Sequence, residues 1–252
     1  MELCAGPWSG SGRTDMSKVA IVAAFEREIR PLVKDWHADD KEQQGRRFRF
    51  FVNGEFVLVC GGIGAEAARR AAEAVIALYD PTIVYSAGFA GALDPSLKVG
   101  EILRPGRVVN VGDGSTAILD GADGVLVTFG SVASPAQKAK LRESFGAHAV
   151  DMEAAAVARA AEARGISFGA IKVISDASDF ELPSMERFVN SEGKFSEFRF
   201  ALFAAVRPWT WGRVIRLARN SKCASDALCS ALRKLDSDQI TESPQARPSA
   251  AI

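Results

Sequence analysis

The sequence has very few of the residues that bind transition metals. Only two histidines, His37 and His148, occur among its 252 residues, and its four cysteines form no CxxC pair. Zinc sites in proteins are built from closely spaced His and Cys ligands. The sequence therefore nearly excludes a zinc-dependent hydrolase, and we expect neither a metal nor an organic cofactor.

An excess of charge and a long apolar run are also missing. The 31 basic side chains are balanced by 31 acidic ones, so no global attraction to nucleic acid or to an anionic membrane is expected. No stretch approaches the roughly 18 apolar residues of a membrane span, and the N-terminus does not have the pattern of a signal peptide. We therefore expect a cytoplasmic protein with no nucleic-acid partner and no stable membrane insertion.

Strand-like and helix-like segments alternate along the chain. Residues 19–24 form an apolar run of strand length, and Asn53-Gly54 lies between two further strand-like runs, as in a two-residue hairpin turn. A helical pattern over 62–80 leads into a strand over 82–93, and residues 134–145 carry the signals of a capped helix. These patterns predict an α/β protein with helices on both faces of a mixed sheet.

The two ends of the chain differ in composition from its middle. Residues 1–16 are rich in Gly and Ser and residues 236–252 are polar, so we expect both to be disordered tails. Between them we expect one domain over 17–206, with basic, Trp-containing helices over 207–235 packed on it.

The segment 207–222 carries five basic residues, no acidic residue and two tryptophans. This composition suits a membrane surface or an amphiphilic substrate. We prefer the alternative in which a helix covers the core with Val214, Ile215 and Leu217 while its arginines face water.

Gly62 and Gly64 follow a strand and open a helix, which superficially matches the dinucleotide-binding fingerprint. That fingerprint also needs an acidic residue at the end of the next strand, where this chain has Ala87 and Gly88. A tight turn between strand and helix is therefore the preferred interpretation. Walker and GxSxG motifs are absent from the sequence, so nothing supports an NTPase or an α/β-hydrolase.

Carboxylates follow three of the predicted strands. Ligands of open α/β sheets bind outside the carboxyl ends of the strands, so we expect these side chains to converge on one site. Any one of these pairs could instead have a structural role, as favourable charge near a helix N-terminus or as the cap of a turn. The residues are Glu26 and Glu28, Asp151 and Glu153, and Asp176 and Asp179.

Five segments, AFEREI, GIGAEAA, SAGFAGALDPSLKVGEI, VDMEAAAVA and KVISDASD, occur in this order over roughly residues 18–180. The ordered set resembles the superfamily of purine nucleoside phosphorylases and methylthioadenosine/S-adenosylhomocysteine nucleosidases, in its nucleosidase-like branch. The resemblance implies a three-layer αβα fold around a twisted mixed sheet. It also implies a homodimer or larger oligomer that cleaves the N-glycosidic bond of purine nucleosides.

The resemblance assigns roles to several of these residues. Asp176 would hydrogen-bond or protonate purine N7 with a carboxyl group that is protonated or shares a proton, Ser175 would orient Asp176, and Glu28 would activate the attacking water. Glu153 would accept hydrogen bonds from the ribose hydroxyls, and Met152 would pack against the sugar. Such groups suit a reaction that passes through an oxocarbenium-like state.

Further residues are expected around the same pocket. Phe25 would border it, and Val132, in the segment 129–132, would lie beside the base. Phe89 stands where related nucleosidases commonly have serine, and Lys172 where they have arginine. We expect both on the nucleophile side, where the usual phosphate cradle is missing, so water is the preferred nucleophile. Lys172 still offers one positive charge, which leaves phosphate as an alternative.

We therefore expect a nucleosidase that hydrolyses a purine nucleoside, by resemblance an adenine nucleoside such as methylthioadenosine or S-adenosylhomocysteine. One alternative is phosphorolysis of a purine nucleoside, including one joined to a lipid. The other, from a different class, is a nucleoside-binding protein without catalytic turnover.

Overall fold

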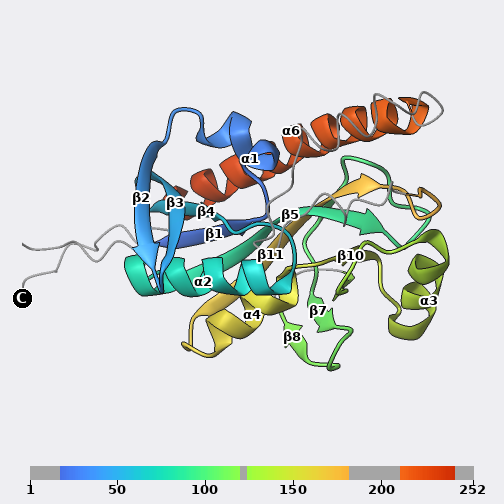
Figure 1. The fold of residues 1–252 in the computed structure, drawn as a ribbon, viewed down its shortest axis with the longest axis horizontal. Coiled ribbons are helices and arrows are strands. Elements are labelled where there is room, and N and C mark those ends of the chain that lie inside the picture. Colours follow the sequence, from blue (N-terminus) through green and yellow to red (C-terminus); the bar gives the residue numbers. More distant parts are fainter. Residues whose placement is uncertain (1–17, 120–123, 182–210, 242–252) are drawn as a thin grey trace, which may run out of the picture.

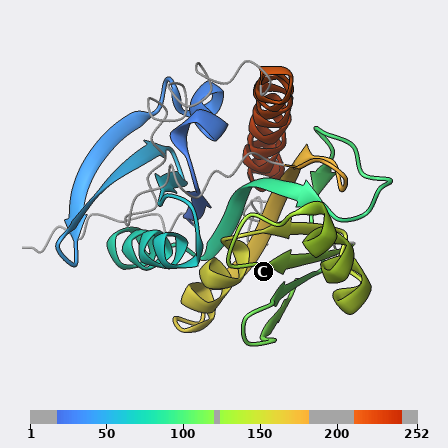
Figure 2. The same cartoon turned by 45° about the vertical axis from the view of Figure 1, so that its right-hand side comes forward.

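The computed structural model describes residues 18–119, 124–181 and 211–241 of the chain. In these residues an eleven-stranded sheet lies between helices (Figure 1), and parallel and antiparallel pairs of strands both occur. Helices α2 and α4 cover one face, and α1 and α6 cover the other (Figures 1 and 2). The predicted α/β class and the αβα layers around a mixed sheet are therefore confirmed.

The strands of the sheet are β1 (Val19–Ala23), β2 (His37–Gln43), β3 (Arg46–Asn53), β4 (Phe56–Cys60), β5 (Ile83–Ala92), β6 (Ile102–Leu103), β7 (Arg107–Asn110), β8 (Thr116–Ile118), β9 (Val125–Thr128), β10 (Ala149–Asp151) and β11 (Ser167–Asp176). The helices are α1 (Glu26–Val33), α2 (Ala65–Tyr79), α3 (Pro135–Phe145), α4 (Ala154–Glu162) and α6 (Trp211–Thr241).

Strand β5 is the central branch point of the sheet. Strand β11 pairs with it in parallel along most of its length. On its other edge, β1 pairs with β5 in parallel only as far as Ser86, and β10 pairs with it in antiparallel orientation at Gly91 and Ala92. Because β1 and β10 run toward each other, the chain segments that follow their carboxyl ends meet beside residues 87–90 of β5.

The predicted hairpin is present. Strands β3 and β4 are antiparallel, with Asn53 opposite Phe56 and Gly54 at a φ of 56° in the turn. The edge strand β2 was not predicted, because its sequence HADDKEQ is polar on both faces and lacks the alternation of a half-buried strand. A charged edge strand of this kind also discourages pairing with another sheet.

The C-terminal region differs from the expectation in two ways. Helix α6 is one continuous helix that extends six residues into the segment 236–252, expected to be a disordered tail. Ile215 was also expected to pack on the core, but its side chain is 52% exposed. Leu217 is half-buried, and the buried residues of α6 come later, with Leu228 and Leu232 among them. The expected tail over 1–16 and the helix that the sequence SEFRFALFAAVRPW predicts over 196–209 lie outside the described residues.

Helix α6 packs most of its buried side chains against α1 and β11. Leu228 is fully buried beside Ile29 and Val33 of α1 and Ile171 of β11. Among the residues that the structure describes, no helix is both long enough and apolar enough to cross a membrane.

We expect Leu228→Ala to lower the free energy of unfolding by about 2–5 kcal/mol, because it leaves a cavity between α6, α1 and β11. Ile215→Ala, on the same helix but at an exposed position, should change it by less than about 0.5 kcal/mol. Urea unfolding followed by circular dichroism measures both changes. Equal effects of the two substitutions would contradict this packing of α6.

Candidate active site

The candidate site is a cavity of about 340 Å³ at the junction beside β5 where the ends of β1 and β10 meet. Its wall includes residues 87–91 of β5, the segment after β1, the segment after β10 and the carboxyl end of β11. Leu217, Ala218 and Ser221 of α6 form a further part of the wall. The antiparallel entry of β10 into an otherwise parallel part of the sheet therefore creates the site.

Eight of the nine residues predicted for the site line this cavity: Phe25, Glu28, Phe89, Val132, Met152, Glu153, Ser175 and Asp176. The ninth, Lys172, is 1% exposed and lies behind the lining residues. Ser131 and Val132 of the segment 129–132 reach the cavity, whereas Phe129 packs into a hydrophobic cluster with α3.

Glu28 lies in the first turn of α1 with its carboxyl group almost fully buried. Its Oε2 atom has no hydrogen-bond partner within the described part of the chain. Burial, and next the negative charge of Glu153, raise the pKa of Glu28 to about 8, against smaller opposing effects of Arg27 and Lys172. A buried carboxyl group of this kind, on the wall of a cavity, is suited to accept a proton.

The backbone around Glu28 is held from two sides. The Ser225 hydroxyl of α6 donates a hydrogen bond of 2.9 Å to the Glu28 carbonyl. On the side of β5, a Cβ atom added to Gly88 would lie 3.3 Å from Glu28 Oε2. Glycine at position 88 therefore leaves the space that the Glu28 carboxyl group occupies.

Glu153 is fixed by two backbone amides. The Gly64 N–H donates to Glu153 Oε1 at 2.8 Å, and the Met152 N–H donates to Oε2 at 3.2 Å. Burial and the nearby Asp151 raise the pKa of Glu153, while Lys172 and the two amides oppose the rise. Gly64, one of the two glycines that resembled a dinucleotide fingerprint, therefore serves to orient an acidic side chain.

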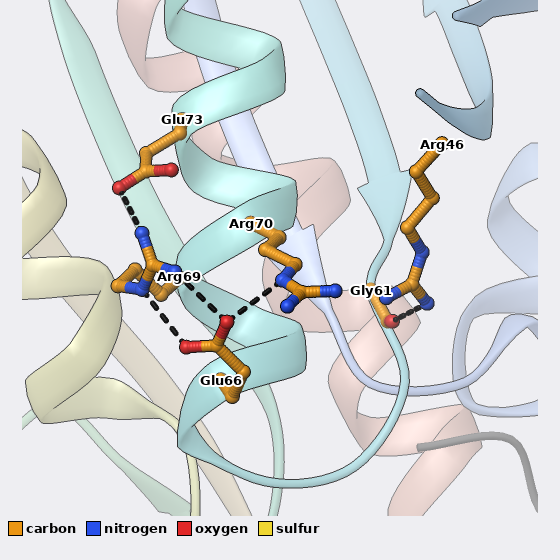
Figure 3. A network of polar contacts seen from close by, with 6 residues as sticks. All are labelled: Arg46, Gly61, Glu66, Arg69, Arg70 and Glu73. Carbon is orange, nitrogen blue, oxygen red and sulfur yellow. Dashed lines mark hydrogen bonds and ion pairs between the residues drawn. The ribbon is translucent and has the colours of Figure 1, made fainter. Parts of the chain in front are cut away.

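The loop that carries Gly64 is stabilised by the contacts drawn in Figure 3. Arg46 donates to the Gly61 carbonyl at 3.3 Å. In the first turn of α2, Glu66 accepts hydrogen bonds from Arg69 and Arg70, and Arg69 also contacts Glu73. These contacts hold the start of α2, and with it the amide that binds Glu153.

A buried ion pair joins Lys172 of β11 to Asp151 of β10 at 2.8 Å. The Lys172 ammonium also donates to the Ser86 hydroxyl at 3.0 Å, and Asp151 accepts from the Thr128 hydroxyl at 2.7 Å and from the Ala154 amide at 2.8 Å. Burial alone would lower the pKa of Lys172, but the charges of Asp151 and Glu153 raise it above its usual value. Lys172 is thus a buried cation held by Asp151, and Asp151 also binds the first amide of α4.

Asp176 ends β11 and is held by two neighbours. The Ser175 hydroxyl donates to Asp176 Oδ1 at 2.7 Å. The Lys138 ammonium of α3 forms an ion pair with Oδ2 and also donates to the Ala177 carbonyl at 2.7 Å. Lys138 was not among the predicted site residues, although its spacing from Leu141 and Phe145 places it on the inward face of α3 and could have indicated it.

The described residues contain no group of three or more His, Cys, Asp or Glu side chains arranged to hold a metal ion. The polar side chains that line the cavity include instead the Glu28 and Glu153 carboxyl groups near β1 and β10, and Asp176 with its ion-pair partner Lys138 at the end of β11. Such an arrangement can move protons at two separate positions of one bound molecule.

Comparison with known proteins places these features in a family. A family model described as the phosphorylase superfamily matches residues 18–125 and 122–206. The chain is 32% identical over 100 residues to the 5'-methylthioadenosine/S-adenosylhomocysteine nucleosidase of Marinomonas sp. (strain MWYL1), a match that covers 38% of this chain and 42% of that protein. It is 25% identical over 218 residues to the aminodeoxyfutalosine nucleosidase of Campylobacter jejuni, which covers 72% of this chain and 95% of that protein.

A solved structure shares the fold. The 5'-methylthioadenosine/S-adenosylhomocysteine nucleosidase of Helicobacter pylori superposes with a TM-score of 0.67 and 17% sequence identity, over 88% of this chain and 98% of that one. At this identity the likeness concerns the fold alone.

We expect Glu28→Gln to stabilise the protein in a pH-dependent manner. The Glu28 pKa is about 8 in the folded protein, against an ordinary value of 4.5. Between these values the folded state binds more protons than the unfolded state, so the wild type loses stability as the pH rises. The variant does not have this loss, and it should be more stable by on the order of a few kcal/mol near pH 8 and by almost nothing near pH 4.

Urea unfolding at several pH values measures this difference. Glu26→Gln, on the same helix turn but exposed, serves as the matched control and should show no pH-dependent gain. If the stability gain of Glu28→Gln does not grow between pH 4 and pH 8, the conclusion that ionisation of the buried Glu28 carboxyl group destabilises the folded protein would be contradicted.

Proposed function

The chain belongs to the phosphorylase superfamily, and we propose that it is a nucleosidase that hydrolyses the N-glycosidic bond of a purine nucleoside. The observation that carries the proposal is the buried Glu28 carboxyl group, whose Oε2 atom has no partner in the described chain and lies on the cavity wall. A water molecule bound there would satisfy this oxygen and would be positioned for activation as a nucleophile.

In the proposed reaction, the groups at the two ends of the cavity act on different parts of the nucleoside. As the bond between ribose C1′ and purine N9 breaks, positive charge develops on the sugar and negative charge on the base. Glu28 takes a proton from the attacking water, and Glu153 accepts hydrogen bonds from the ribose hydroxyls. Asp176 directs a proton to purine N7, which stabilises the leaving base.

The charges in the site favour water over phosphate as the nucleophile. Lys172 lies behind the lining and is bound by Asp151 and Ser86, so its charge is already compensated. Glu28 and Glu153 also line the cavity on the nucleophile side, and once Glu28 is ionised, above its pKa of about 8, its negative charge would repel a phosphate dianion. We therefore propose hydrolysis, with phosphorolysis as the alternative.

We propose an adenine nucleoside with a 5′ substituent, such as methylthioadenosine or S-adenosylhomocysteine, as the substrate. The support is the similarity to the Marinomonas protein, whose name specifies these two nucleosides. The Campylobacter relative is named for aminodeoxyfutalosine, which makes that nucleoside the second candidate.

Incubation of the protein with methylthioadenosine in phosphate-free buffer should release adenine and free methylthioribose, detected by chromatography and mass spectrometry. Glu28→Gln and Asp176→Asn should each lower kcat by about 10²-fold or more, because each removes one proton-transfer group. Glu26→Gln should keep the wild-type rate, since Glu26 is exposed and does not line the cavity.

Two other outcomes would contradict the proposal in different ways. Base release that requires phosphate and yields methylthioribose 1-phosphate would make the protein a phosphorylase. Tight nucleoside binding by calorimetry without base release, across methylthioadenosine, S-adenosylhomocysteine and aminodeoxyfutalosine, would make it a nucleoside-binding protein.

A further inference from the structure

Lys138 is a buried lysine on a helix that otherwise presents its charged side chains to solvent. It is 2% exposed, lines the cavity and forms an ion pair with Asp176. Lys140, Arg142 and Glu143 on the same helix are exposed. Burial of an ammonium group costs several kcal/mol, and an apolar side chain at this position would serve packing better. The position of Lys138 therefore points to a role at Asp176.

Strand β5 makes room for this pair. A Cβ atom added to Gly91 would lie 3.0 Å from Asp176 Oδ2 and 3.3 Å from Lys138 Nζ. Any larger residue at position 91 would crowd both groups. The backbone of β5 thus accommodates Lys138 and Asp176 at one end of the cavity, as Gly88 accommodates Glu28.

The hydrogen bonds of Asp176 determine its charge in the resting site. Oδ1 accepts from the Ser175 hydroxyl, and Oδ2 accepts from the Lys138 ammonium. Both oxygens act as hydrogen-bond acceptors in this arrangement, so neither carries a proton for a leaving base. The sequence-based expectation of a protonated or proton-sharing Asp176 therefore requires a second group that holds the proton.

We propose that Lys138 holds this proton and that Asp176 passes it to the leaving base. The inference rests on the proposed nucleosidase function. When the C1′–N9 bond breaks, its electron pair goes to the purine, and Asp176 gives a proton to N7 while it takes one from the Lys138 ammonium. Glu28 takes one proton from the attacking water, whose oxygen bonds to C1′. That proton returns through solvent to the neutral Lys138 amine, so one nucleoside and one water yield one sugar and one free base.

Other charged groups surround the pair. Near it on the protein surface are Arg142 and Glu143 of α3, Asp94 after β5 and Asp179 after β11; those that line the same cavity are Arg27, Glu28, Asp151 and Glu153. Strand β9, which packs against α3, contributes no charged residue. Lys138 is therefore the cation in direct contact with Asp176.

Two substitutions separate proton supply from simple charge pairing. Lys138→Met removes the ammonium, so the proton that Asp176 passes to the base must come from solvent, which supplies it less readily as the pH rises. Its activity near pH 5 should stay within about tenfold of the wild type, while the alkaline limb of kcat/KM should move down by at least about one pH unit. Lys138→Arg keeps the charge but does not give up a proton, so its kcat should fall by about 10²-fold at every pH.

Full pH profiles of adenine release from methylthioadenosine test the inference, with Lys140→Met as the matched control on the exposed face of α3. Near pH 5 we expect Lys138→Met to be more active than Lys138→Arg. If Lys138 only supplied positive charge, Lys138→Arg would be the more active of the two. Thermal unfolding of each variant shows whether it is folded. Should Lys138→Met not fold, the kcat of Lys138→Arg decides the question.

Wild-type kcat in Lys138→Arg, or an unshifted pH profile in Lys138→Met, would overturn the role of Lys138. Both outcomes leave the nucleosidase function intact, because they require a wild type that releases adenine. A wild type that releases no base at any pH would instead refute the proposed function.

Discussion

The buried ion pair between Lys172 and Asp151 is the interaction on which the arrangement of the site depends. Lys172 lies on β11 opposite Gly88 of β5, and Asp151 ends β10 on the other edge of β5, so the pair joins the two strands that flank β5. Charges buried this deeply are stable only with good partners, and Ser86, Thr128 and the Ala154 amide provide them. The same cation moderates the pKa of Glu28 and of Glu153, so the pair sets the charge of the cavity as well as its shape.

The cavity exists because β5 changes its partner on one edge. Strand β1 leaves this edge after Ser86, and β10 joins it from the opposite direction at Gly91. Gly88 and Gly91 then leave space for the Glu28 carboxyl group and for the Lys138–Asp176 pair. One ten-residue strand thus separates the proposed nucleophile side from the proposed base side, and its small residues determine which acidic groups fit at each.

The sequence was sufficient to predict the parts of this arrangement that repeat a local pattern. The hairpin at Asn53-Gly54, the capped helix α3 and the carboxylates after strands all follow from short-range chemistry. The position of Lys172 behind the cavity wall and the partnership of Lys138 with Asp176 depend on contacts between residues 21 and 38 positions apart. Sequence spacing does not encode such contacts, and a lysine on a helix is usually solvated. Helix α6 shows the same limit, because its apolar pattern predicts a buried Ile215, which is 52% exposed, whereas Leu228 is fully buried.

Glu28 and Asp176, the two proposed proton-transfer groups, lie in different environments. This difference explains why Glu28 would accept a proton and Asp176 would donate one. Glu28 has an unpartnered oxygen in a desolvated position, which raises its pKa to about 8 and makes its anion a good proton acceptor near neutral pH. Asp176 has the Lys138 ammonium beside it, which holds a transferable proton next to the carboxyl group. Positive charge that develops on the sugar would acidify the attacking water as its oxygen bonds to C1′, and negative charge on the base would draw the proton from the Lys138–Asp176 pair. In the proposed reaction, the electrostatic changes of bond cleavage would therefore favour both proton transfers in the direction that hydrolysis requires.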